Sequence, residues 1–188
     1  MRDDSLRQLV LSAMFLALGF VLPFFSGQLP QIGQTLLPMH IPVLLCGLIC
    51  GWKCGLAVGF MLPLLRALVC GLPAFYPMAL AMAGELAVYG ALGGWLFAGA
   101  RWHCLPMLYR SMLTAMVGGR AVWVSLMALF MGIVNQSFTL GALLLAGFVQ
   151  TLPGVILQLA VVPAIMLALE RTHWRGRPSG EKASLNSK

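Results

Sequence analysis

Charge alternates between the apolar stretches of this chain. Six such stretches lie along the 188 residues, and the segments that separate them are alternately basic and uncharged. Because Lys and Arg are retained on the cytoplasmic side of a membrane, the basic segments are expected inside the cell and the uncharged ones outside. The pattern predicts an all-α membrane protein: a six-transmembrane-helix bundle with the N-terminus and the C-terminus both in the cytoplasm.

The order of the gaps along the chain gives the predicted spans. Basic residues precede the first stretch, occupy the second gap at Lys53, flank the fourth gap at Arg101 and Arg110, and follow the sixth stretch. The uncharged gaps are residues 26–36, 71–76 and 135–141. The predicted spans are residues 6–25, 38–51, 55–70, 77–97, 111–134 and 143–169. The first span resembles a signal peptide, but no A-x-A cleavage site follows it, so we expect it to be retained.

The composition excludes an ordinary soluble domain. Hydrophobic residues make up 60% of the chain and charged residues only 9%, too few to cover a water-exposed surface. The net charge of +7 belongs mostly to the predicted cytoplasmic segments, so topology and lipid headgroups explain it better than a nucleic-acid partner. We therefore expect a multi-pass protein of the cell membrane. Residues 1–170 would form one membrane domain, and residues 171–188 a basic, disordered cytoplasmic tail.

The second predicted span is shorter than a bilayer requires. Its 14 residues would rise only ~21 Å as a helix, whereas the hydrocarbon core is ~30 Å thick. We expect this segment to be buried among neighbouring helices, or to have a loop that dips into the membrane beside it.

Three ionisable residues, Arg66, Glu85 and Arg120, fall within predicted spans. Each costs about 2.5–3.5 kcal/mol at the centre of a bilayer on insertion scales, so each is a candidate functional residue. The helical rise brings Glu85 and Arg120 to similar depths, and Arg66 would reach Glu85 from nearer the outer surface. The three form either a simple ion pair between helices or a ligand site with surplus positive charge, and we favour the ligand site. Arg66 would either line this site or extend to the outer headgroups.

Other polar and aromatic residues are weaker candidates for the same site. His40 begins the second span, Tyr89 lies one helical turn from Glu85, and Trp123 lies one turn beyond Arg120. Asn135 in the last external loop and several glutamines, among them Gln150 and Gln158, complete the predicted outer cavity.

Small residues recur every fourth position in the first three spans. The positions are Ala13 and Ala17, followed by Gly47, Gly51, Gly55 and Gly59. This spacing lets helix backbones approach closely in lipid. It serves either packing within the chain or docking of another membrane protein, and spacing alone does not decide between them.

Motifs for catalysis or metal binding are missing. The sequence has no G-x-x-x-x-G-K-[ST], H-E-x-x-H or G-x-S-x-G motif. Cys46, Cys50 and Cys54 are spaced four apart, but no Cys or His pair has the spacing of a metal site, so we interpret them as small apolar packing residues. We expect no enzymatic activity, no metal and no cofactor.

Several segments together resemble the substrate-binding S component of an energy-coupling factor (ECF) transporter. They are residues 37–47, the glycines Gly51, Gly55 and Gly59, the turn Gly71-Leu72-Pro73, the pair Gly119-Arg120, and the alanines Ala13 and Ala17. Their order and the predicted topology extend the resemblance over all six spans.

The resemblance implies a vitamin or micronutrient importer that binds its substrate near the outer face. The face of Ala13 and Ala17 would dock a transmembrane coupling subunit joined to two cytoplasmic ATPases. The pantothenate, cobalamin and queuosine-precursor types are the most similar, although the family often has Arg where this chain has Glu85. Glu85 would suit a guanine-like edge or a cationic amine, and Arg120 a carboxylate. The alternative is a structural or assembly subunit that transports nothing.

Overall fold

The computed structural model describes residues 2–25, 39–71, 73–99, 105–133 and 152–175. Within these ranges the chain is helical and has no strand, as the sequence predicts. The α-helices are α1 (Arg2–Phe25), α3 (His40–Cys50), α4 (Trp52–Cys70), α5 (Leu80–Ala98), α6 (Leu105–Ile133) and α8 (Leu152–Arg175), and a short π-helical turn, η1 (Phe75–Ala79), precedes α5.

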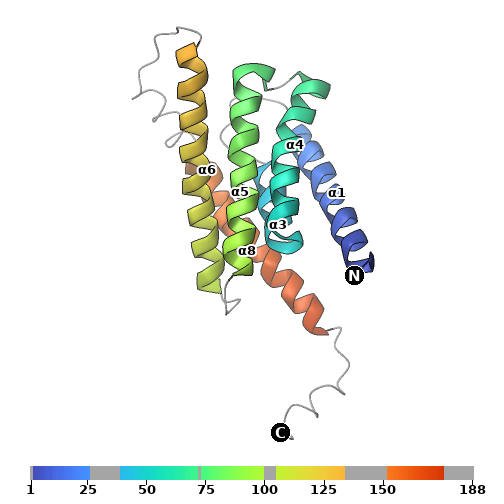
Figure 1. Cartoon of the computed structure of the whole chain (residues 1–188). Coiled ribbons are helices and arrows are strands. Elements are labelled where there is room, and N and C mark those ends of the chain that lie inside the picture. Colours follow the sequence, from blue (N-terminus) through green and yellow to red (C-terminus); the bar gives the residue numbers. More distant parts are fainter. Residues whose placement is uncertain (1, 26–38, 72, 100–104, 134–151, 176–188) are drawn as a thin grey trace, which may run out of the picture.

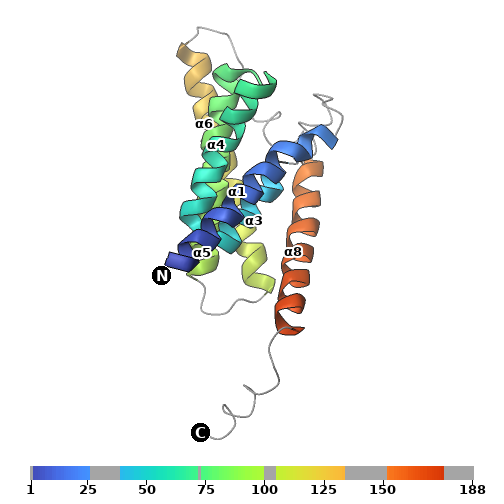
Figure 2. The same cartoon turned by 90° about the vertical axis from the view of Figure 1, so that its right-hand side faces the viewer.

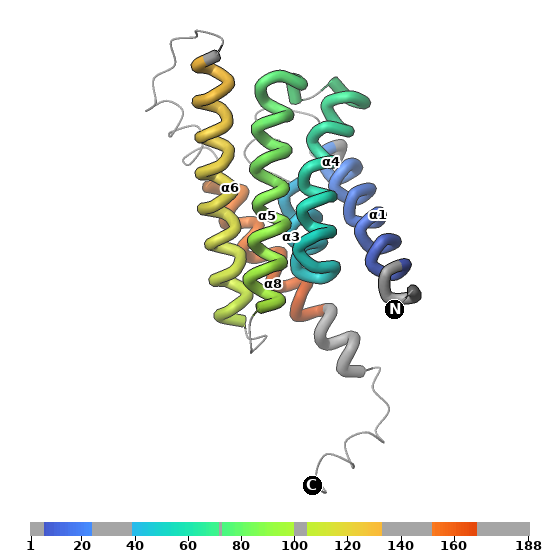
Figure 3. The backbone as a smooth tube through the Cα atoms, viewed as in Figure 1, coloured from blue at the N-terminus to red at the C-terminus, as the bar shows by residue number. Residues whose placement is uncertain are grey.

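The central helix is α5, which packs against α3, α4 and α6. Figures 1 and 2 show α4, α5 and α6 as a row of long helices, with α3 and α8 behind it and α1 crossing diagonally over α3 and α4. The colours along the tube in Figure 3 show that α4, α5 and α6 alternate in direction. The start of α1 and the end of α8 lie at the same end of the bundle (Figure 1). Which end faces the cytoplasm stays a prediction.

Among the described residues, four helical segments are long and apolar enough to cross a membrane. They are Leu6–Pro23, Trp52–Cys70, Phe75–Ala98 and Leu105–Gly132. The apolar parts of α3 and α8, His40–Cys50 and Leu152–Ala168, are shorter. The chain is therefore a multi-pass helical protein, and the number of six spans remains a prediction.

Among the described α-helices, the shortest, α3, is also the most buried. It has 11 residues, and all of them except Ile49 are buried. Its apolar side chains form the main core together with residues of α1, α4, α5, α6 and α8. This confirms the first of the two arrangements expected for a segment too short to span the bilayer: it is enclosed by its neighbours.

Two helix boundaries differ most from the prediction. α6 begins at Leu105, six residues before the predicted start, so Arg110 lies on the helix with its side chain exposed. Pro106 at the start of α6 explains the early beginning, since proline suits the first turn of a helix. α8 continues to Arg175, beyond the proposed domain boundary at residue 170. Residues 143–151 of the sixth predicted span lie outside the described residues.

Three of the four regularly spaced glycines pack within the chain. A Cβ atom on Gly55 would lie 2.6 Å from the Cα of Gly47 and 2.7 Å from the carbonyl oxygen of Gly90 on α5. One on Gly59 would meet the backbone of Leu86 on α5. Gly51 instead forms the reversal between α3 and α4, where its φ of 93° favours glycine. We call these contacts of Gly47, Gly55 and Gly59 with α5 the glycine seam. For these glycines, packing within the chain is the alternative that the structure supports.

Candidate functional site

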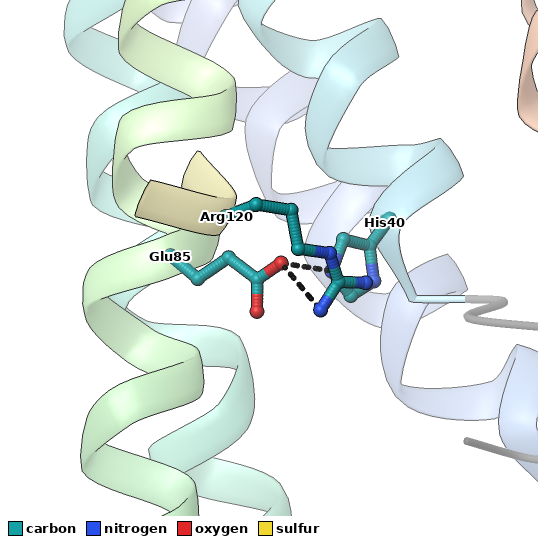
Figure 4. Close-up of polar contacts among 3 residues, drawn as sticks. All are labelled: His40, Glu85 and Arg120. Carbon is teal, nitrogen blue, oxygen red and sulfur yellow. Dashed lines mark ion pairs between the residues drawn. The ribbon is translucent and has the colours of Figure 1, made fainter. Parts of the chain in front are cut away.

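A group of ionisable side chains lies inside the bundle, where α3, α5 and α6 meet. His40 on α3 is fully buried, Glu85 on α5 is 1% exposed, and Arg120 on α6 is 6% exposed. Figure 4 shows the three side chains converging from their helices. We call His40, Glu85, Arg120 and the adjacent Tyr89 the polar cluster.

One carboxylate oxygen is the meeting point of the polar cluster. Glu85 Oε1 lies 3.2 Å from Arg120 Nη1 and 3.6 Å from His40 Nε2 (Figure 4). The contact with Arg120 is an ion pair by distance, yet no hydrogen bond to this oxygen has adequate geometry in the described part of the chain. The predicted meeting of Glu85 and Arg120 is therefore present, and His40 joins them.

Tyr89 forms one wall of the polar cluster. Its ring meets that of His40 edge-on, with the ring centres 5.0 Å apart and the planes at 83°. The phenol is close enough to Glu85 and Arg120 to interact electrostatically with both. Gly119 makes room for this ring, because a Cβ atom at that position would collide with it and lie 3.2 Å from the carbonyl oxygen of Glu85.

Many polar atoms of this buried region have no hydrogen-bond partner among the described residues. In the polar cluster they are both ring nitrogens of His40, Oε1 of Glu85, the hydroxyl of Tyr89, and Nε and Nη2 of Arg120; outside it they are Nε of Arg66 on α4 and both amide atoms of Gln158 on α8. Leaving a buried polar group unsatisfied costs about 1–3 kcal/mol, and such groups are rare in native proteins. A concentration of this kind is therefore typical of a site that receives a polar ligand.

Arg66 does not join the polar cluster. It is buried on α4, but no described acidic side chain lies within ion-pair distance of it. The pairing of Gly59 with Leu86 along the antiparallel helices α4 and α5 places Arg66 near the start of α5, ~9 Å along the axis from Glu85. The expected contact between Arg66 and Glu85 is thus not formed. Helical rise gives the height of a residue, but not the direction in which its side chain points.

The remaining predicted residues have different positions. Trp123 is buried in a separate apolar cluster with Ala81 and Met127. Asn135 and Gln150 lie outside the described residues.

Sequence reasoning gave too little weight to Gln158. It was one of several glutamines, but it is fully buried on α8, which packs against α3 and α6. The available signal was its spacing: Gly154, Gln158 and Val162 lie one turn apart and are all buried. A polar side chain within an apolar membrane helix is also a candidate functional residue.

These features define the class of protein: a multi-pass helical membrane protein with a buried polar site. The family model described as ECF transporter, substrate-specific component, matches residues 7–166, and the chain belongs to this family. It is thus a substrate-specific transporter component, not an enzyme. Its partners are a small-molecule substrate and the ECF module of membrane and ATPase subunits. No curated protein and no solved structure showed significant similarity to the chain.

Proposed function

We propose that this protein captures a vitamin-like small molecule from the outer face of the cell membrane and presents it to a transmembrane coupling subunit with two ATPases. Membership in the S-component family supports transport. The observation that carries capture by this chain is the polar cluster, whose buried donors and acceptors lack partners in the described residues.

The polar cluster fits a ligand site better than an ion pair that only joins helices. A structural pair needs additional hydrogen bonds to offset the desolvation of its two charges. Here Glu85 Oε1 and Arg120 Nε and Nη2 have no such bonds within the described ranges. A bound substrate would supply these hydrogen bonds, so substrate binding and the geometry of the polar cluster would depend on each other.

The position of Glu85 supports capture from the outer face. It lies five residues after the start of α5 at Leu80 and 13 residues before its end at Ala98, which correspond to ~8 Å and ~20 Å of helix. The nearer end follows residues 71–76, an uncharged segment that the sequence predicts to be external. The shorter route to the site therefore comes from the predicted outside.

We further propose that the lipid-facing side of α1 docks the coupling subunit. Ala13 and Ala17 are both exposed on this side, and large apolar neighbours such as Val10 and Met14 are more than half exposed. The other side of α1 packs against α3 and α4. Small residues on an exposed helix face allow the close approach that membrane helices use to associate.

Replacing Arg120 with Ala tests substrate capture. The variant should lose binding, because Arg120 supplies donors that are unsatisfied in the described residues and balances the charge of Glu85. Small molecules that co-purify with the wild-type protein would be identified by mass spectrometry, and their affinities measured by the thermal stabilisation of purified protein. Arg110→Ala is the matched control, since Arg110 lies on the same helix with its side chain exposed.

Two outcomes would contradict the proposal. Unchanged affinity in Arg120→Ala protein, with normal membrane insertion, would remove Arg120 from the site. If no small molecule bound the wild-type protein, the polar cluster would be an ion pair without a ligand. That result would favour the structural or assembly subunit.

A further inference from the structure

We propose that the polar cluster selects a substrate whose buried part is uncharged and carries hydrogen-bond donors and acceptors side by side, as a carboxamide or lactam does. This inference rests on the proposed function and decides between the carboxylate, the amine and the guanine-like edge that the sequence leaves open. It is carried by the charge of the site, by its hydrogen-bonding capacity and by Gln158.

The polar cluster pairs one negative with one positive side chain, so their formal charges cancel. It contains one carboxylate, Glu85, and one guanidinium, Arg120, and these form an ion pair at 3.2 Å. Arg66 does not add its charge here, because it makes no ion pair with a described residue and lies nearer the start of α5. A charged substrate group would therefore enter a low-dielectric site with no free countercharge, which is unfavourable.

The unpaired atoms of the site include donors and acceptors together. Arg120 Nε and Nη2 can only donate, Glu85 Oε1 can only accept when ionised, and the Tyr89 hydroxyl can do both. A substrate carboxylate would satisfy the donors of Arg120, but would repel Glu85 and leave its oxygen unsatisfied. A substrate ammonium would have the opposite defect. A carboxamide or lactam offers an N–H to Glu85 and a carbonyl to Arg120.

Gln158 extends the same chemistry to α8. It is fully buried, and neither its Oε1 nor its Nε2 has a hydrogen-bond partner in the part of the chain that the structure describes. Its helix packs against α3 and α6, which carry His40 and Arg120. A primary amide pairs with a second amide or lactam through one donor and one acceptor and adds no charge. We assign Gln158 as a residue that determines specificity for the uncharged group.

The test compares neutral compounds with their carboxylate counterparts on the purified full-length protein. The probes are nicotinamide with nicotinate and the primary amide of pantothenic acid with pantothenate, together with every small molecule that co-purifies. Thermal stabilisation gives the affinities. In each compound that binds, one chemical group contacts the site, and its binding changes in Glu85→Gln and Arg120→Gln protein. We expect this group to be uncharged at neutral pH. Each carboxylate counterpart should bind about 100-fold or more weakly, because it leaves a buried polar group of the site unpaired.

Variants of opposite charge provide the second measurement. Glu85→Gln leaves Arg120 uncompensated, so it should shift preference toward the carboxylate member of a pair, whereas Arg120→Gln should not. Arg110→Gln, which removes an exposed charge from the same helix, should bind like the wild type. Gln158→Leu should weaken binding of the neutral compound. The elution profile of this variant in size-exclusion chromatography should match that of the wild type.

The outcomes separate this inference from the proposed function. A wild-type protein that prefers the carboxylate or an ammonium compound, with binding lost in Arg120→Gln or Glu85→Gln, would overturn the neutral-group inference and leave substrate capture standing. A wild-type protein that binds no co-purifying molecule and no probe would contradict substrate capture itself. Equal affinity of Gln158→Leu and wild-type protein would remove Gln158 from the site.

Discussion

At the scale of single residues, the polar cluster depends on Gly119, which has no side chain. The ring of Tyr89 occupies the space beside Gly119 and meets His40 edge-on. Since Arg120 follows Gly119 directly, the same turn of α6 both admits the ring and provides the guanidinium. The pair Gly119-Arg120 is thus one local arrangement with two roles.

Gly119→Ala should destabilise the protein by about 1–3 kcal/mol, because the added methyl group collides with the Tyr89 ring and overpacks the interface. It should also weaken substrate binding, since displacement of Tyr89 disturbs the contact with His40. Thermal unfolding in detergent and substrate affinity measure the two effects. Gly132→Ala on the same helix is the control, because a Cβ atom there meets no atom of the described residues within 4 Å. That change should be neutral or stabilising by up to about 1 kcal/mol. Equal stability of the two variants would contradict the packing described for Tyr89.

At the scale of helices, the bundle contains one helix that its neighbours enclose and one that is largely exposed. α3 is buried on nearly all sides and contributes His40 to the site, whereas only 17% of the apolar segment Leu6–Pro23 of α1 is buried. Substrate binding is therefore expected to depend on α3, α5 and α6, and partner association on α1.

Changing both Ala13 and Ala17 to Leu should leave substrate affinity within about twofold of wild type, since both residues are exposed on α1, which contributes no residue to the polar cluster, and surface changes of this kind have small effects. The double substitution should abolish uptake by cells that express the whole transporter. The larger side chains would prevent a helix of the coupling subunit from packing closely against α1. Ala57→Leu and Ala128→Leu, which alter exposed positions on α4 and α6, are the controls. Normal uptake in the doubly substituted protein would reject the proposed docking face.

At the scale of the whole molecule, the sequence predicted the helices well and the site in part. The thickness of a bilayer fixes the length of an apolar segment, so hydropathy located α1, α4 and α5 within a few residues. The cost of intramembrane charge singled out Glu85 and Arg120, which do meet. The rotation of each helix about its axis is set by packing, which spacing does not reveal.

The misplaced residues follow from this missing rotation. Arg66 was expected to reach Glu85 and does not, and Trp123 packs with Ala81 and Met127 in a separate apolar cluster. Gln158 was considered only as one of several glutamines, because single polar residues near loops are common. The structure shows that both of its amide atoms are buried without a hydrogen-bond partner among the described residues.

The predicted topology can be tested with reporter fusions. Alkaline phosphatase fused after Ile133 should be active, because the end of α6 is predicted to face the exterior, where the enzyme can form its disulfides. The same reporter fused after Arg175 should be inactive, and green fluorescent protein at that position should fluoresce. Both fusions must insert in equal amounts, as checked by immunoblotting. The reverse pattern of activity would overturn the predicted orientation and, with it, capture from outside.

The glycine seam restricts how this bundle can change shape. Where Gly55 meets Gly90, and Gly59 meets Leu86, backbone faces backbone with no side chain between them that could change rotamer. Sliding α4 past α5 would drive carbonyl groups into one another, since close-packed interiors do not deform continuously. We therefore expect α4 and α5 to move together as one rigid body. Any opening that admits or releases a substrate would then occur where this pair contacts the other helices.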